Sequence, residues 1–158
     1  MGCLIREIEK KDIPDIENIL ESSDNFSPEE IKCAIDMINT TLANQDDYRF
    51  LCLEEESRVV GYTCYGPTPL TQGTFDLYWI CVDQKFQKHG VGTRLLHETE
   101  KEIINSSGRL VIVETSSNEK YLSAVKFYKK NNYSVASVIK NFYRDGEDKI
   151  IFIKNIKV

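Results

Sequence analysis

The sequence has 158 residues, of which 41% are hydrophobic and 28% are charged. This length suits one domain, and the composition is that of a globular chain, which excludes a coiled coil, a collagen and a disordered tail. The formal net charge of −5 argues against nucleic acid as a partner, because proteins that bind it usually carry the opposite sign. No apolar run approaches about 20 residues, the length that spans a bilayer, so we expect no membrane partner.

The cysteines indicate where the protein resides. There are five of them, an odd number, and they are widely spaced without a Cys-x-x-Cys pair. This pattern favours reduced thiols inside a cell over a disulfide scaffold or a zinc site. The N-terminus lacks a basic start followed by an apolar stretch, so we expect no signal peptide and a cytoplasmic protein.

The first part of the chain predicts a strand and two helices. Residues 4–8 form a short apolar run that is typical of a strand. Asp12 stands where a helix N-cap would, with Pro14 in the first turn. Residues 27–30 read Ser-Pro-Glu-Glu, a capping box with proline at the first helical position. Apolar residues at helical spacing follow each start, namely Ile13, Ile16, Ile19 and Leu20, and then Ile31, Ala34, Ile35 and Ile38.

Strands dominate the middle of the chain. Residues 50–53 and 59–65 are separated by a polar stretch and predict a hairpin. A loop rich in glycine and proline covers residues 66–73. Residues 75–82 are apolar, aromatic and β-branched almost throughout, which predicts a central strand that is buried on both faces.

The last part alternates helices and strands. The pattern predicts a helix over 91–103, a strand over 110–113, a helix over 121–128 that ends at Asn131 and Asn132, and strands over 133–139 and 149–153. The resulting order βααβββαβαββ predicts an α/β (α+β) fold with a mixed sheet. Residues 75–82 and 110–113 should run parallel, because a helix connects them.

Residues 82–96 are the most informative segment for function. A buried strand ends there, a polar loop with Gly90 and Gly92 follows, and a helix begins. Free amides at a helix N-terminus and the positive end of its dipole favour an anion, to which Lys88, His89 and the Thr93 hydroxyl would add donors. No Walker lysine loop occurs, and Leu95 stands where a dinucleotide motif needs glycine. A plain strand-to-helix turn stays open as the alternative.

Two segments resemble signatures of the GNAT superfamily of N-acetyltransferases. Residues 87–92, Gln-Lys-His-Gly-Val-Gly, match its (Gln/Arg)-x-x-Gly-x-(Gly/Ala) motif, between a buried strand and a helix. Residues 123–133 resemble its second motif, with Asn132 in place of a glycine. Residues 141–148 resemble the end of the ribosomal-protein N-terminal alanine acetyltransferase branch. The resemblance covers roughly residues 50–155, judged from the positions of these motifs.

The resemblance implies a fold and a cofactor. The expected fold is a single N-acetyltransferase domain over residues 1–158, with a mixed central sheet of six to seven strands and helices on both faces. Acetyl-CoA is the implied co-substrate, its pantetheine arm bonded to the backbone of one strand and its diphosphate held by the glycine loop. The implied cofactor-binding residues are Ile80, Cys81, Val82, Gln87, Lys88, His89, Gly90, Val91, Gly92, Thr93 and Asn118.

The resemblance also implies two catalytic residues. Tyr128 matches the tyrosine that gives a proton or a hydrogen bond to the leaving sulfur, although an ordinary core aromatic is the alternative. Glu114 matches the branch's general base, although a solvated or salt-bridged glutamate is the alternative. The interval between them is longer than the branch pattern, so Asp76 and Tyr78 stay in reserve. Asn118 is equally explained as a helix cap.

The implied reaction is transfer of an acetyl group to a primary amine of an unidentified acceptor. The acceptor could be a small molecule or a peptide N-terminus, shaped by the first two helices and the loops at 66–73 and 141–148, the latter being acidic. The alternative is a CoA-binding regulatory or sensor module without efficient catalysis. We expect no metal, because His89 and His97 lack partners at ligand spacing. A homodimer is left open.

Overall fold

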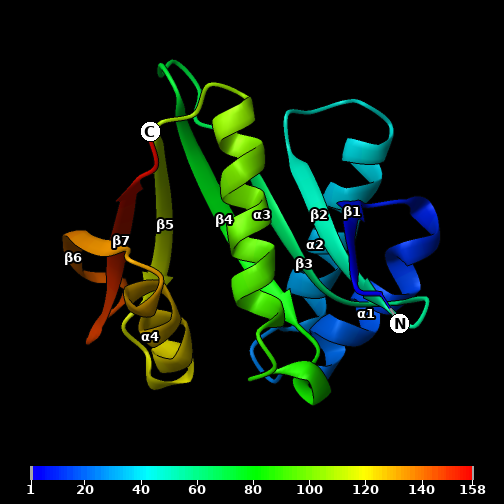
Figure 1. Cartoon of the computed structure of the whole chain (residues 1–158). Helices are drawn as coiled ribbons and strands as arrows, with labels where there is room; N and C mark the ends of the chain where they lie inside the picture. Colours follow the sequence, from blue (N-terminus) through cyan, green and yellow to red (C-terminus); the bar gives the residue numbers. More distant parts are fainter. Residues whose placement is uncertain (1, 158) are drawn as a thin grey trace. The chain divides into compact units, whose positions relative to one another are not determined.

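The elements follow the predicted order in a computed structural model, which describes residues 2–157 (Figure 1). The strands are β1 (Leu4–Glu7), β2 (Arg49–Glu55), β3 (Arg58–Pro67), β4 (Thr74–Val82), β5 (Leu110–Ser116), β6 (Ser134–Arg144) and β7 (Glu147–Asn155). The helices are α1 (Ile13–Ser22), α2 (Pro28–Leu42), α3 (Val91–Asn105) and α4 (Leu122–Lys130). None of the helices described is long and apolar enough to cross a membrane.

The strands form one mixed sheet in the order β1-β2-β3-β4-β5-β7-β6. The pairs β1–β2, β2–β3, β5–β7 and β6–β7 are antiparallel. Thr74–Asp76 of β4 pair in parallel with Leu110–Ile112 of β5, as the connecting helix predicts. The predicted α/β fold with a mixed sheet is therefore confirmed, and its seven strands agree with the six to seven expected.

The chain's contacts divide it into two compact units. The first unit comprises the residues up to Gly66 together with Trp79–Glu102, and the second comprises Pro67–Tyr78 and the residues from Ile103 onward. β4 therefore contributes its first half to the second unit and its second half to the first. Each unit is described by itself below.

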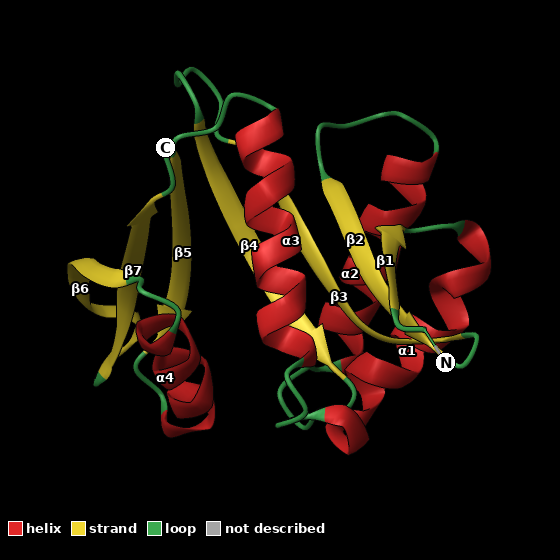
Figure 2. Ribbon diagram, viewed as in Figure 1, coloured by secondary structure: helices red, strands yellow, loops and turns green. Residues whose placement is uncertain are grey.

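Helices cover both faces of the strands in the first unit. Cys52 of β2 belongs to a buried cluster with Ile16 of α1 and Ile38 of α2. Its neighbour Leu53 belongs to another cluster, which contains Leu95 of α3. Because successive strand residues point to opposite faces, α1 and α2 lie on one face and α3 on the other, as Figure 2 shows for these elements. This arrangement was predicted.

The capping box of α2 is confirmed. The Ser27 hydroxyl accepts a hydrogen bond from the Glu30 amide at 3.2 Å, and the Glu30 carboxylate accepts one from the Ser27 amide at 2.7 Å. Asp12 stands directly before α1 as predicted, but its side chain does not cap that helix. It binds the Arg6 guanidinium at 2.8 Å instead, because Arg6 extends from β1 to this buried position. The pairing compensates the free energy that burying both charges costs.

In the second unit, α4 packs against one face of β7. The ring of Tyr128 lies 5.8 Å from that of Phe152 on β7, measured between centroids. α4 is followed by Asn132 with a φ of 69°, so asparagine adopts here the left-handed conformation predicted for it. The last two strands are longer than predicted, and they meet at Asp145 and Gly146, where Gly146 has a φ of 81°.

Two sequence predictions about strands were wrong. Residues 141–148 are mostly strand rather than loop, because a tight turn at Gly146 needs few residues and the polar Lys140 and Asn141 hide the strand pattern. The second half of β4 is not buried on both faces, since Tyr78 is 37% exposed. An apolar run does not reveal whether another element covers each of its faces.

Candidate active site

The loop after β4 turns sharply before it enters α3. Asp83 caps a short 3-10 turn, Gln84–Phe86, by accepting a hydrogen bond from the Lys85 amide at 2.9 Å. Gln87 then donates its side-chain amide to the Val82 carbonyl at 3.3 Å. Lys88 and Gly90 have φ angles of 66° and 80°. These two left-handed residues direct the chain into the helix, and the space beside Gly90 is open.

The start of α3 presents backbone donors in a positive environment. Its first backbone hydrogen bond runs from the Arg94 amide to the Gly90 carbonyl at 3.0 Å, so the amides of residues 91–93 precede any intrahelical acceptor. The exposed Lys85, Lys88 and Arg94 lie along residues 84–97, a stretch without aspartate or glutamate. The helix dipole adds to this charge. The loop is therefore suited to phosphate oxygens in a chain whose net charge is negative.

Residues 80–82 offer their backbone rather than their side chains. The Cys81 side chain lies in the core cluster of α1 and α2, and burial raises the pKa of its thiol to about 12. Ile80 and Val82 pack against the cluster that contains Leu95 of α3. With all three side chains engaged in packing, only main-chain groups are left to recognise a ligand, as expected for binding that resembles strand addition.

Glu114 lies within β5 of the second unit, and its carboxylate is paired. Its Oε2 is 2.6 Å from the Nζ of Lys149 on β7. The side chain of Glu114 is 49% exposed, and that of Lys149 is 14% exposed. Lys149 also lies 4.2 Å from the centroid of the Phe142 ring. The salt-bridged alternative therefore describes Glu114 in this structure. Sequence reasoning missed Lys149 and Phe142, since only the pairing of β5, β7 and β6 brings them to Glu114.

Tyr128 is held rigidly by other aromatic rings. Its side chain is only 6% exposed. Its ring centroid lies 5.4 Å from that of Phe127, 5.7 Å from that of Tyr133 and 5.8 Å from that of Phe152. The ring therefore has the packing of a core aromatic, and a catalytic role for its hydroxyl stays a prediction.

Asn118 and the acidic turn are engaged in local structure. Asn118 accepts a hydrogen bond from the Lys120 amide at 3.1 Å and caps the 3-10 turn Glu119–Tyr121. Glu147 binds Ser116 at 2.5 Å and Arg144 at 2.7 Å. Asp148 pairs with Lys140 at 2.9 Å. Glu147 and Asp148, two of the acidic residues expected to attract an amine, are thus already paired with cations of β6.

The reserve candidates are also placed within the second unit. Asp76 accepts a hydrogen bond from the Thr68 hydroxyl at 2.7 Å, which occupies one of its oxygens. Tyr78 is partly exposed. Across residues 2–157, no group of three or more histidine, cysteine, aspartate and glutamate side chains is gathered as a metal ion would need.

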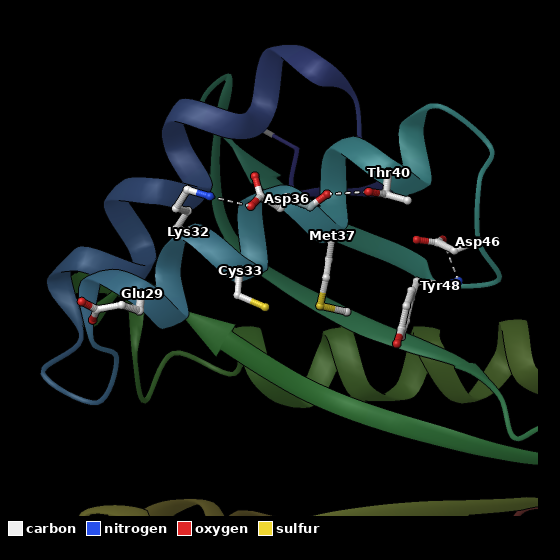
Figure 3. A pocket seen from close by; sticks show the side chains of 8 residues that line it. All are labelled: Glu29, Lys32, Cys33, Asp36, Met37, Thr40, Asp46 and Tyr48. Atoms are coloured by element: carbon white, nitrogen blue, oxygen red, sulfur yellow. Dashed lines mark hydrogen bonds and ion pairs between the residues drawn. The ribbon is translucent and has the colours of Figure 1, made fainter.

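A hollow of about 440 Å³ opens on α2 of the first unit, and Figure 3 shows the side chains that line it. Its rim carries three carboxylates and Lys32, which pairs with Asp36 at 3.1 Å. Cys33, Met37 and Tyr48 supply apolar surface. The full lining is Glu29, Lys32, Cys33, Asp36, Met37, Thr40, Asp46 and Tyr48. No predicted cofactor or catalytic residue lines this hollow.

Comparison with known proteins identifies the family of this chain. A family model described as an acetyltransferase (GNAT) domain matches residues 46–135. A GNAT-family protein of known structure from Desulfovibrio desulfuricans is 36% identical, with a TM-score of 0.94, and the match covers 99% of this chain and 100% of that one. A search of curated proteins finds no match.

More distant structures share the fold. A ribosomal-protein alanine N-acetyltransferase from Escherichia coli is 20% identical with a TM-score of 0.77, over 99% of this chain and 96% of that one. An aminoglycoside 6'-N-acetyltransferase complexed with coenzyme A is 16% identical with a TM-score of 0.79, over 98% of each chain. At these identities the similarity concerns the fold alone.

Proposed function

Because the chain belongs to the GNAT acetyltransferase family, we propose that it transfers an acetyl group from acetyl-CoA to a primary amine. The observation that carries the proposal is the loop into α3, with its left-handed Lys88 and Gly90, its free first-turn amides and its positive side chains. A diphosphate is the ligand such a loop favours. A neighbour with the same fold binds coenzyme A.

We assign the binding of the cofactor to two segments. The amides of residues 91–93 would hold the diphosphate, with Gln87, Lys88, His89 and the Thr93 hydroxyl as further donors. The main chain of residues 80–82 would bond the pantetheine arm, because the side chains there are engaged in packing. Asn118 would add a contact through its side chain.

The chemistry needs a base and an acid. Alkylammonium groups have a pKa of about 10.4, so an acceptor amine arrives protonated at neutral pH. Glu114 would take that proton, alone or through a water molecule. The amine nitrogen would then bond to the carbonyl carbon of the thioester while the carbon–sulfur bond breaks. Tyr128 would give a proton or a hydrogen bond to the departing sulfur, which its rigid ring favours.

The proposed acceptor is a cationic amine, either a small molecule or a peptide N-terminus. The half-exposed carboxylate of Glu114 supports a cationic acceptor, because it can pair with an ammonium group as it does with that of Lys149. Cytoplasmic location remains a prediction, and a homodimer is left open.

Turnover is the first test of the proposal. Thiol release from acetyl-CoA should be measured with a panel of primary amines. Turnover with one of them should fall at least about tenfold in Tyr128→Phe. Tyr121→Phe, which removes a hydroxyl from the 3-10 turn before the same helix, should leave the rate unchanged. Equal rates in the two variants would remove Tyr128 from the mechanism.

Gly90 and Gly146 provide a test variant and its matched control for the binding of coenzyme A. Gly90 and Gly146 have φ angles of 80° and 81°, and a methyl group added to either would meet open space. Alanine at each position therefore carries a similar backbone strain of about 1–2 kcal/mol. Calorimetry should show weakened coenzyme A binding in Gly90→Ala only. Normal affinity in that variant would contradict the phosphate loop.

The same two measurements decide between the enzyme and the alternative. A CoA-binding regulatory or sensor module would bind coenzyme A in calorimetry and release no thiol with any amine of the panel. An enzyme would do both.

A further inference from the structure

In the second unit, the ammonium group of Lys149 lies beside Glu114, the proposed general base. An acceptor amine would have to occupy the same position to give its proton to that base. The Nζ of Lys149 is 2.6 Å from Oε2 of Glu114, within the range of about 2.6–3.2 Å over which a base takes a proton. The Phe142 ring lies beneath the same nitrogen at 4.2 Å. A carboxylate and an aromatic face together form a site for an alkylammonium ion.

The strand register explains how Lys149 reaches this position. Lys149 pairs with Ser116 and Ile151 pairs with Glu114, so Glu114 and Lys149 are diagonal neighbours on one face of the β5–β7 pair. Val113 and Phe152 point to the opposite face, where Phe152 meets Tyr128 of α4. Lys149 is therefore held by strands on the face away from α4, and its side chain is only 14% exposed.

From this geometry we propose that the enzyme acetylates its own Lys149. The proposal rests on the proposed function, which supplies acetyl-CoA and makes Glu114 the base. Lys149 gives a proton to Glu114, and the freed lone pair on Nζ forms a bond to the carbonyl carbon of the thioester. The carbon–sulfur bond breaks, and the sulfur leaves as a thiolate that takes a proton. The products are an acetylated Lys149 and coenzyme A, and no group is oxidised or reduced.

Acetylation would change the state of the base. An acetylated Lys149 has no charge and no longer pairs with Glu114, so the carboxylate becomes available to an external amine. Self-acetylation would thus act as a priming step. Unmodified enzyme should show a lag in thiol release with an external amine, and enzyme that has been incubated with acetyl-CoA should not.

The test is incubation of the full chain with acetyl-CoA in the absence of any amine. Intact-mass measurement should show the gain of one acetyl group, and peptide mapping should place it on Lys149. Lys140 is the internal comparison, because it forms a similar ion pair with Asp148 but is 78% exposed. Acetylation by solution chemistry alone would modify Lys140 first. Modification of Lys140 ahead of Lys149 would overturn the proposal.

Variants separate the enzymatic reaction from chemical background. Lys149→Arg should gain no acetyl group, whereas Lys140→Arg should gain one at the rate of the unchanged protein. Glu114→Gln should slow the modification of Lys149 at least about tenfold. A rate on Lys149 that is independent of Glu114 would overturn the proposal.

Coenzyme A binding and amine turnover are measured on the same preparation. If an external amine is acetylated over many turnovers while Lys149 stays unmodified, self-acetylation is wrong and the proposed function stands. If the protein neither binds coenzyme A nor releases thiol, both are wrong.

Discussion

Each unit of the molecule holds an ion pair of nearly the same length, yet the two pairs differ in their surroundings. Arg6 and Asp12 of the first unit are 2.8 Å apart, and Lys149 and Glu114 of the second are 2.6 Å apart. The Asp12 side chain is 4% exposed, against 49% for Glu114. Distance alone therefore does not separate a structural ion pair from one that is open to a reacting group.

The partners of the two carboxylates explain the difference. Asp12 accepts further hydrogen bonds from the second guanidinium nitrogen of Arg6 at 2.9 Å and from the Glu9 amide at 2.7 Å. Burial opposes ionisation of Asp12, but these bonds and the charge of Arg6 outweigh it, so its pKa is lowered. Glu114 keeps half of its surface in solvent. The first carboxylate is committed to the fold, and the second is accessible to chemistry.

The largest expected effect comes from breaking the buried pair. Asp12→Asn should lower the free energy of unfolding by about 2–4 kcal/mol, because Arg6 then loses two charge-assisted hydrogen bonds and keeps only Glu54 as a partner. Urea denaturation measures the change. Lys11→Gln is the control, since Lys11 forms only a solvent-exposed ion pair with Glu9, and such a pair should contribute little to stability. Equal midpoints in the two variants would contradict the structural role of Asp12.

The ion pair between Glu114 and Lys149 should affect turnover more than stability. Glu114→Gln should lower turnover about a hundredfold, because the acceptor loses its base. The same variant should lower the unfolding free energy by only about 1–2 kcal/mol, because Lys149 loses its carboxylate but keeps the Phe142 ring as a partner. Steady-state rates and urea denaturation on one preparation measure both quantities. A stable variant with unchanged turnover would place the base elsewhere.

Lowering the pH should weaken the buried ion pair between Asp12 and Arg6 and so reduce the stability of the fold. Because the pKa of Asp12 lies below its ordinary value of 3.8 in the folded state, the unfolded state binds the proton first as the pH falls. The stability that Asp12 contributes is therefore complete above about pH 5 and is lost as the pH falls through its folded pKa. Unfolding followed across this range should show a weaker dependence in Asp12→Asn. Parallel curves would assign the acid sensitivity to other carboxylates.

The smallest effect on stability is expected for Glu54, the more exposed of the two carboxylates that bind Arg6. Glu54 bonds Arg6 at 2.7 Å, but its side chain is 25% exposed and Arg6 keeps Asp12. Glu54→Gln should therefore cost about 1 kcal/mol or less of unfolding free energy. A loss as large as that of Asp12→Asn would show that the three residues act as one indivisible group.

Features encoded by a few neighbouring residues could be predicted from the sequence. The capping box at Ser27, the left-handed Asn132 and the glycine loop before α3 each depend on residues within one turn or motif. The parallel pairing of β4 and β5 follows from the helix between them. The extension of β6 through Lys140 and Asn141 was missed, since its polar residues interrupt the apolar pattern.

Features that depend on distant strands could not be predicted. Arg6 meets Glu54 only after β1 has paired with β2. Lys149 meets Glu114 only when β7 lies beside β5 in one register, and a shift of one residue would turn Lys149 to the other face. The resemblance therefore suggested Glu114 as a candidate base, but nothing in the sequence indicated Lys149 as its partner.

The shape of β6 has a consequence for handling the protein in solution. This strand is one of the two edges of the sheet, and all eleven of its residues are exposed, including Val138 and Phe142. Such an edge could template the strands of other molecules into aggregates. The register breaks twice along it, Asn141 adopts a φ of 55°, and Lys140 adds charge. These irregularities interrupt the row of backbone groups, so concentrated samples should stay clear as long as the kinks are kept.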